Sequence, residues 1–374
     1  MAIKYNRGAR ITQKNRGLFR LTKRGLCGII LPKIIFCGVY MNDVRKQYRK
    51  TLTRMGITML VWAFLFNILM LAASFIDFII PMSWSEEAYE IISSLLYDAA
   101  YLGAFMLPLA FLKLISDRKK LEPMRFEIKL SWEALALISC GVVCLFAFSY
   151  VNGIMMDVLR IPDGESLITE ATEKMSDNGL ILQFITLALV PAFCEEFLFR
   201  GVILSNLMPY GRATAIVISS VLFGLMHGNL EQFLYTTVGG IMLGLIYVLT
   251  DSIWCSVLMH MINNSISVLQ IAIYDRLAEP YASGIYAMLV GLVFLCGLAS
   301  MVYLAVRFGK KSRAPQSEIK SFFGASEGQH RTESLPVGVR NGLTATDVID
   351  FLKNPMILLF AAYSLLSAVL MLVL

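Results

Sequence analysis

Three charged residues lie close together inside a long apolar stretch of the chain. In the segment PAFCEEFLFRG, residues 191–201, the adjacent acids Glu195 and Glu196 are followed by Arg200. A charge at membrane depth costs at least ~2.5 kcal/mol on insertion scales, and ionisable groups placed there usually serve a function. This segment is therefore the first candidate for chemistry.

Helical geometry gives the two acids different surroundings. Neighbours on an α-helix point about 100° apart, so we predict that Glu195 and Glu196 do not fill one small site together. Glu196 and Arg200 are spaced i, i+4 with the acid first, which is the favourable order for an ion pair. Glu195 is then the unpaired acid and the functional candidate. The competing interpretation is a structural salt bridge beside a water-filled groove.

Two of the three histidines also lie in apolar segments. Phe223 and His227 (FGLMH) share a helix face one turn apart, and so do His260 and Asn264 (HMINN). Either histidine alone is explained by a hydrogen bond between helices. At 1.5 Å per residue, Glu195 lies about 20 Å and His227 about 22 Å above the cytoplasmic ends of their helices. On the same measure His260 lies about 12 Å and Asn264 about 18 Å above the start of theirs. We expect them to share a polar cavity inside a helical bundle.

These residue types allow hydrolysis by an activated water. Glu195 and His227 can polarise a water and move its proton, and His260 with Asn264 can donate to a developing oxyanion. The sequence places no Ser or Cys evidently beside a base, which favours water as the nucleophile. The alternative is a metal, because Glu195, His227 and His260 form the His₂Glu set of a catalytic zinc site. The residues do not decide between a reaction without a cofactor and one with a divalent metal such as zinc.

The same residues resemble the signature of the CPBP family, which comprises the CAAX prenyl endopeptidases of the Rce1 type and the Abi or bacteriocin-processing proteins. The family pattern EExxxR, FxxxH and HxxxN occurs in order between residues 195 and 264. The resemblance covers about 180–270 and implies an intramembrane endopeptidase whose helices enclose the site. It implies Glu195 and His227 as the water-activating pair, and His260 with Asn264 on the oxyanion. The implied catalytic set is Glu195, Glu196, His227, His260 and Asn264, supported by Arg200 and Phe223.

Composition predicts the scaffold around these residues. Of 374 residues, 57% are hydrophobic and 16% are charged, whereas soluble domains carry about 25% charged residues. We predict an all-α, polytopic transmembrane bundle of eight or nine spans with the active site inside it. The spans are expected at 56–76, 93–115, 132–151, 180–207, 213–228, 232–250, 253–274, 285–306 and 355–374. Basic residues in alternate loops place the N-terminus in the cytoplasm and the C-terminus outside, in the plasma membrane.

The chain divides by composition into six parts. They are a basic cytoplasmic arm with an interfacial segment (1–54), N-terminal membrane helices (55–178), a CPBP-like catalytic core (179–274), an additional span (275–307), a polar cytoplasmic linker (308–354) and a C-terminal membrane helix (355–374), expected to be an accessory anchor. The arm holds fourteen Lys and Arg and one acid, which favours anionic lipid over nucleic acid as its partner. Leu26–Tyr40 is expected to lie at the interface. Residues 1–25 and 308–354 are expected to be poorly ordered.

Two further expectations concern single features. Met41 opens a stretch typical of the start of a membrane protein, so residues 1–40 are hypothesised to be an upstream extension that an intact mass would test. Gly239, Gly240 and Gly244 have the small-xxx-small spacing of packed membrane helices, and we assign them to packing.

We therefore predict an intramembrane endopeptidase that cleaves a membrane-associated protein or peptide in the bilayer. Prenylated CAAX-type or bacteriocin-like substrates are suggested by the resemblance alone, and nucleic acid is not an expected partner. Two alternatives stay open. A transporter or ion pathway also uses buried Glu, His and Asn, and a relative without catalytic activity could serve as an immunity or scaffold protein.

Overall fold

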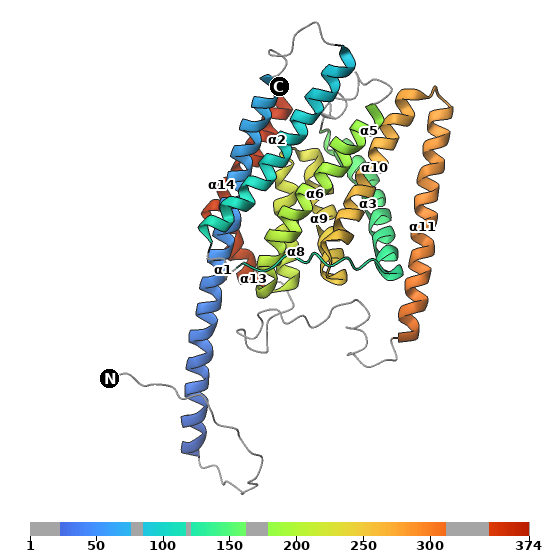
Figure 1. Cartoon of the computed structure of the whole chain (residues 1–374). Helices are drawn as coiled ribbons and strands as arrows, with labels where there is room; N and C mark the ends of the chain where they lie inside the picture. The colour runs from blue at the N-terminus through green and yellow to red at the C-terminus, as the bar shows by residue number, and fades with distance from the viewer. Residues whose placement is uncertain (1–22, 76–84, 117–120, 162–178, 312–343, 374) are drawn as a thin grey trace. The chain divides into compact units, whose positions relative to one another are not determined.

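The computed structural model describes residues 23–75, 85–116, 121–161, 179–311 and 344–373. Within them every regular element is helical. The elements are α1 (Lys23–Ser74), α2 (Glu86–Ile115), α3 (Trp132–Leu159), α5 (Gly179–Gln183), η3 (Phe184–Leu189), α6 (Val190–Glu196), η4 (Phe197–Leu204), α7 (Ser205–Leu207), η5 (Met208–Tyr210), α8 (Arg212–Met226), α9 (Leu230–Thr250), α10 (Ile253–Arg276), α11 (Tyr281–Lys311), α13 (Ala345–Leu352) and α14 (Pro355–Val373). Residues 1–47 and 48–374 form two separate compact units. The packing described below is that of the second unit (Figure 1).

The predicted all-α, polytopic membrane bundle is confirmed. In the described residues seven helices are long and apolar enough to cross a membrane, and an eighth span results if α13 and α14, which meet at a 67° bend, are counted as one. The segment 213–228 differs from its prediction as a full membrane span. It forms α8, which has only 15 residues, and a straight helix of that length covers about 22 Å, less than the hydrocarbon core.

The N-terminal arm (1–54) and the linker (308–354) contain more helix than the sequence predicted. Leu26–Tyr40 is part of the continuous helix α1. The linker 308–354 was expected to be mostly disordered, but its end forms α13, where Asp350 and Phe351 are buried. The cause is a capping box, in which Thr344 and Asp347 satisfy each other's backbone N–H groups. The arm 1–22 and residues 312–343 of the linker lie outside the described residues.

The centre of the bundle is the continuous run from α5 to α7, with α8, α9 and α10 around it (Figure 1). As predicted, two of the α9 glycines, Gly240 and Gly244, serve packing, while Gly239 has only an ordinary contact with Leu145. A Cβ atom on Gly240 would lie 2.9 Å from the Cα of Ser220 on α8, and one on Gly244 would lie 3.3 Å from Ile216 of the same helix. The close approach of α8 and α9 therefore depends on these small residues.

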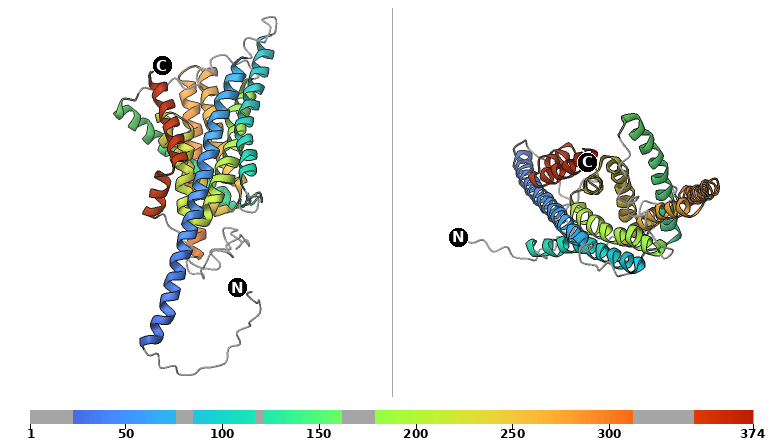
Figure 2. Two further views of the ribbon diagram at one scale, coloured as in Figure 1. Left: turned by 90° about the vertical axis from the view of Figure 1, so that its left-hand side faces the viewer. Right: turned by 90° about the horizontal axis from the view of Figure 1, so that it is seen from above.

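The remaining helices cover opposite sides of this centre. Viewed from above, α14 lies beside residues 48–74 of α1, while α11 lies on the far side next to α3 (Figure 2). The C-terminal helix is more than an accessory anchor, because Phe360 of α14 is fully buried in the same core cluster as Phe199 and Leu204. Many large apolar side chains of α11 are exposed, as expected for a helix that faces lipid.

A cluster of polar contacts fixes the start of α10. Asp251 ends α9 in the left-handed conformation, and its carboxylate binds both Arg125 and Lys129. The N–H of Ile253 donates to the carbonyl of Arg125 at 2.9 Å. Because α10 carries His260 two turns later, this cluster helps to set the height of that side chain.

Candidate active site

The helix that carries the two acids departs from regular α-helical bonding on both sides of them. Residues 184–189 and 197–204 are π-helical, and α6 with the acids lies between them. Pro191 has no N–H to give to the carbonyl of Leu187, and Asn264 of α10 donates to that carbonyl at 3.2 Å. π-Helical turns are frequent at functional sites.

Glu196 forms the predicted ion pair with Arg200. Arg200 Nη1 donates to Glu196 Oε1 at 2.7 Å, and Arg200 Nη2 donates to the carbonyl of Gly240 at 3.0 Å. The ring of Phe223 covers the guanidinium, 4.7 Å from ring centre to Cζ. Both charged side chains are 0% exposed, so this pair is fully withdrawn from solvent and lipid.

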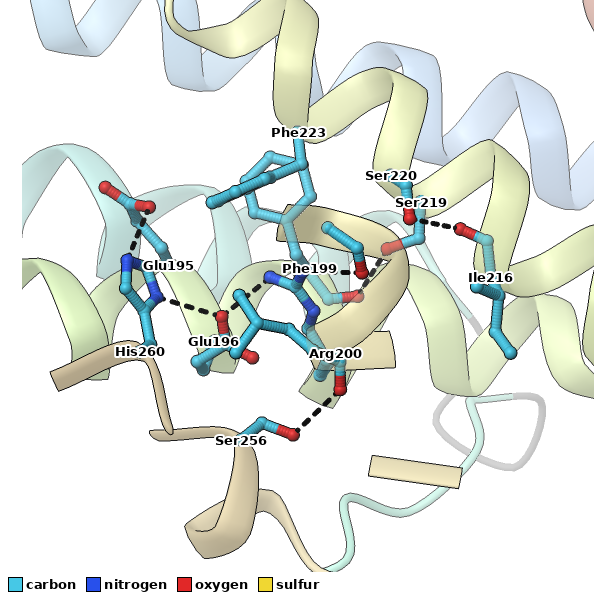
Figure 3. Close-up of polar contacts among 12 residues, drawn as sticks. Glu195, Glu196, Phe199, Arg200, Ile216, Ser219, Ser220, Phe223, Ser256 and His260 are labelled. Atoms are coloured by element: carbon cyan, nitrogen blue, oxygen red, sulfur yellow. Dashed lines mark hydrogen bonds and ion pairs between the residues drawn. The ribbon is translucent and has the colours of Figure 1, made fainter. Parts of the chain in front are cut away.

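His260 brings the two acids into one site. Its Nδ1 donates to Glu196 Oε1 at 3.0 Å, and its Nε2 lies 3.8 Å from Glu195 Oε2. Figure 3 shows the imidazole between the carboxylates, with Arg200 on the far side of Glu196. The prediction that Glu195 and Glu196 do not share a small site was wrong. An imidazole presents one nitrogen on each side, so a single ring can face two carboxylates that point in different directions.

In the described part of the chain, Glu195 has no cationic partner at salt-bridge distance other than this histidine. Its Oε1 accepts a hydrogen bond of 2.5 Å from the hydroxyl of Tyr101 on α2, and its Oε2 is buried without a hydrogen-bond partner in the described residues. Sequence reasoning missed Tyr101, since no motif contains it. The available signal was Asp98, an acid within the apolar segment of α2 and one turn from Tyr101, which marks the face of α2 that points inward.

His227 ends α8 and lies beside the same group. Its Nδ1 bonds to the carbonyl of Phe223 at 2.9 Å. A carbonyl only accepts, so Nδ1 carries the proton and the neutral ring keeps Nε2 as an acceptor. The ring is near enough to Glu195 and His260 for their charges to interact. The ring of Phe223 contacts those of His227 and His260, with centroids 5.1 and 6.0 Å apart.

Asn264 lies one turn beyond His260 and takes part in a different contact. One N–H of its amide is given to the carbonyl of Leu187, and its oxygen accepts from Asn263 at 3.3 Å. The predicted residues are therefore brought to one region of the bundle. Asn264, however, is turned towards the backbone of η3, while His260 lies between the acids.

The three residues considered for zinc are not grouped as a metal site in the described part of the chain. Among the described residues, no group of three or more His, Cys, Asp or Glu side chains is placed to hold a metal ion. This includes the set Glu195, His227 and His260.

Comparison with known proteins identifies the same part of the chain. Residues 177–266 match the family model described as "Type II CAAX prenyl endopeptidase Rce1-like", which confirms the resemblance over that segment. The Bacillus subtilis (strain 168) protein named "Putative membrane peptidase YdiL" is 30% identical over 106 residues, 27% of this chain and 43% of that protein. The chain thus matches less than half the length of this relative. No solved structure matches the chain.

Proposed function

We propose that this integral, multi-pass membrane protein is an intramembrane endopeptidase in which Glu195 activates a water. The observation that carries the proposal is the state of Glu195. It is a buried carboxylate, 5% exposed, with one oxygen held by Tyr101 and the other facing His260, inside the Rce1-like segment. A buried acid without a strong cationic partner is suited to accept a proton.

Two acceptors can orient the water. Glu195 Oε2 takes one of its protons, and the unprotonated Nε2 of His227 accepts a hydrogen bond from the other. The water oxygen then attacks the carbonyl carbon of the scissile peptide bond, and the carbonyl oxygen becomes an anion. His260, whose Nδ1 is bonded to Glu196, donates from Nε2 to this oxyanion. The role that the resemblance gives Asn264 at the oxyanion stays a prediction, which uses the second N–H of its amide.

The same carboxyl completes the reaction. When the C–N bond breaks, Glu195 returns its proton to the leaving nitrogen, so the products are a carboxylic acid and an amine. Glu196 takes no proton in this scheme. Arg200 and His260 both donate to its Oε1, which makes it the group that orients His260.

The substrate class rests on the matched family. Its description names CAAX prenyl endopeptidases, so a lipidated C-terminal peptide is the first substrate to test and a bacteriocin-like peptide the second. We place the N-terminus in the cytoplasm and the site in the plasma membrane, as the loop charges predict.

The experiment compares wild type with Glu195→Gln and His227→Ala, purified and reconstituted in liposomes with a farnesylated CAAX peptide. Membrane peptides from cells that carry wild type or Glu195→Gln are compared in parallel, so that other substrates are found. We expect cleavage to be lost in both variants and retained in Glu279→Gln, which makes the same change at an exposed acid. Chelators should leave cleavage unchanged. Normal turnover by Glu195→Gln refutes the proposal, and solute flux without any proteolysis favours the transporter alternative.

A further inference from the structure

Tyr101 approaches the site from outside the Rce1-like segment. It lies on α2, more than seventy residues before the matched region begins at 177. Its hydroxyl donates to Glu195 Oε1 at 2.5 Å, the shortest hydrogen bond made by either acid. A phenol is a neutral donor, so it stabilises the carboxylate without neutralising it as Arg200 does for Glu196.

The ring of Tyr101 is held by an aromatic ladder, formed by Tyr101, Phe105, Trp62 and Phe360. Tyr101 stacks on Phe105 at 4.8 Å, Phe105 meets Trp62 edge to face at 5.6 Å, and Trp62 meets Phe360 at 6.3 Å. These rings belong to α2, α1 and α14. Helices from both ends of the chain therefore fix the position of the hydroxyl.

We infer that Tyr101 is a positioning residue for Glu195 that reserves Oε1 and leaves Oε2 as the oxygen that accepts the proton from water. The inference rests on the proposed function, and it assigns to α2 a part of the active site that the matched segment lacks. The two oxygens of a carboxylate are chemically equivalent until something binds one of them. Tyr101 binds the oxygen away from His260, so the reacting oxygen is the one 3.8 Å from the imidazole.

The donor also helps to stabilise the Glu195 carboxylate. The charged and titratable groups around it are Tyr101 and Asp98 on α2, His227 at the end of α8, His260 on α10, and Cys194, Glu196 and Arg200 on its own helix. Tyr101→Phe removes one hydroxyl from this set and keeps the ring that stacks on Phe105. A lost hydrogen bond to a charged group corresponds to a factor of about ten or more. The carboxylate is then less stable, because it has lost the donor to Oε1.

The test measures kcat, KM and the pH profile of wild type, Tyr101→Phe and Tyr247→Phe on the farnesylated peptide. Tyr247→Phe is the matched control, because it removes a buried hydroxyl that bonds to Ser205 at 2.6 Å, between two and three turns from the acids and outside the site. We expect Tyr101→Phe to lower kcat about tenfold, to change KM less than twofold, and to move the acidic limb of the profile up by about one pH unit. Tyr247→Phe should leave the limb in place. Substitution of 3-fluorotyrosine at position 101, a stronger donor, should move the limb to lower pH.

An infrared titration gives a readout that needs no turnover. The carboxylate band that Glu195→Gln abolishes is followed against pH, and its midpoint should rise by about one unit in Tyr101→Phe. An unchanged midpoint, or a Tyr101→Phe enzyme with the kcat and acidic limb of wild type, overturns the inference. If Glu195→Gln still cleaves, the proposed function fails instead. If Tyr101→Phe loses only thermal stability, its role is structural and the inference is refuted.

Discussion

Replacing Arg200 by methionine should be among the most destabilising single changes in this protein. Methionine replaces the aliphatic part of the arginine side chain and carries no charge, so the change leaves Glu196 buried at 0% exposure without its cation. Breaking a buried ion pair by removing one partner costs about 3–5 kcal/mol. The carbonyl of Gly240 also loses its donor, which adds about 1–3 kcal/mol.

A double-mutant cycle separates the ion pair from packing. In Glu196→Gln with Arg200→Met, the glutamine oxygen still accepts from His260 while the uncompensated charge is gone. We expect the double variant to be more stable than Arg200→Met alone by at least about 2 kcal/mol. Glu196→Gln alone strands the buried guanidinium and should lie near Arg200→Met.

The assay is equilibrium unfolding of the four proteins in mixed micelles of increasing dodecyl sulfate content, followed by circular dichroism. The reasoning is refuted if Arg200→Met costs less than about 1 kcal/mol. It is also refuted if the losses of the two single variants simply add in the double variant, because the two groups would then not interact.

Two further pairs of variants test the packing that supports the site. Gly240→Ala puts a Cβ 2.9 Å from the backbone of Ser220 and should lower the free energy of unfolding by about 1–3 kcal/mol. Cleavage should also fall, because the Gly240 carbonyl that binds Arg200 moves. The control is Gly239→Ala, which should keep stability and cleavage because the nearest atom is an ordinary 3.5 Å away. Phe360→Ala should lower the free energy of unfolding by about 3–5 kcal/mol in the same assay. Its exposed neighbour is the control, and Leu359→Ala should change stability by no more than about 0.5 kcal/mol. Equal losses within either pair of variants would contradict the packing described here.

The sequence carried much of the fold and of the site because helical spacing is regular. The spacing of Glu196 and Arg200 was enough to predict their ion pair, and the three motifs placed His227, His260 and Glu195 in one region. Prediction from the sequence failed where a contact depends on a distant part of the chain. Nothing near Glu195 in sequence indicates Tyr101, which is 94 residues away, and the sharing of His260 by both acids depends on how α10 packs against α6.

Two local features were readable but weak. The pattern Thr344 to Asp347 is a capping-box signature, and it predicts α13 inside a polar stretch that composition alone assigns to disorder. Pro191 predicts a carbonyl without an N–H partner one turn earlier, although the sequence does not say that Asn264 supplies the donor. Composition predicts whether a segment is apolar helix or polar linker, whereas single polar residues determine the local departures from that prediction.

The two adjacent glutamates show how surroundings divide roles between identical side chains. Glu196 Oε1 receives an arginine and a histidine donor, so protonating it would sacrifice two charge-assisted hydrogen bonds, and it is a poor base. Glu195 receives one hydroxyl donor and faces the second nitrogen of the same imidazole. It can therefore accept a proton at smaller cost, and His260, oriented by Glu196, lies beside it to meet the negative charge that forms on the substrate. The contacts around each glutamate, and not the residue type, therefore determine which of the two acts as the base. A cation introduced next to Glu195, as in Tyr101→Arg, should abolish cleavage even though both acids remain in place.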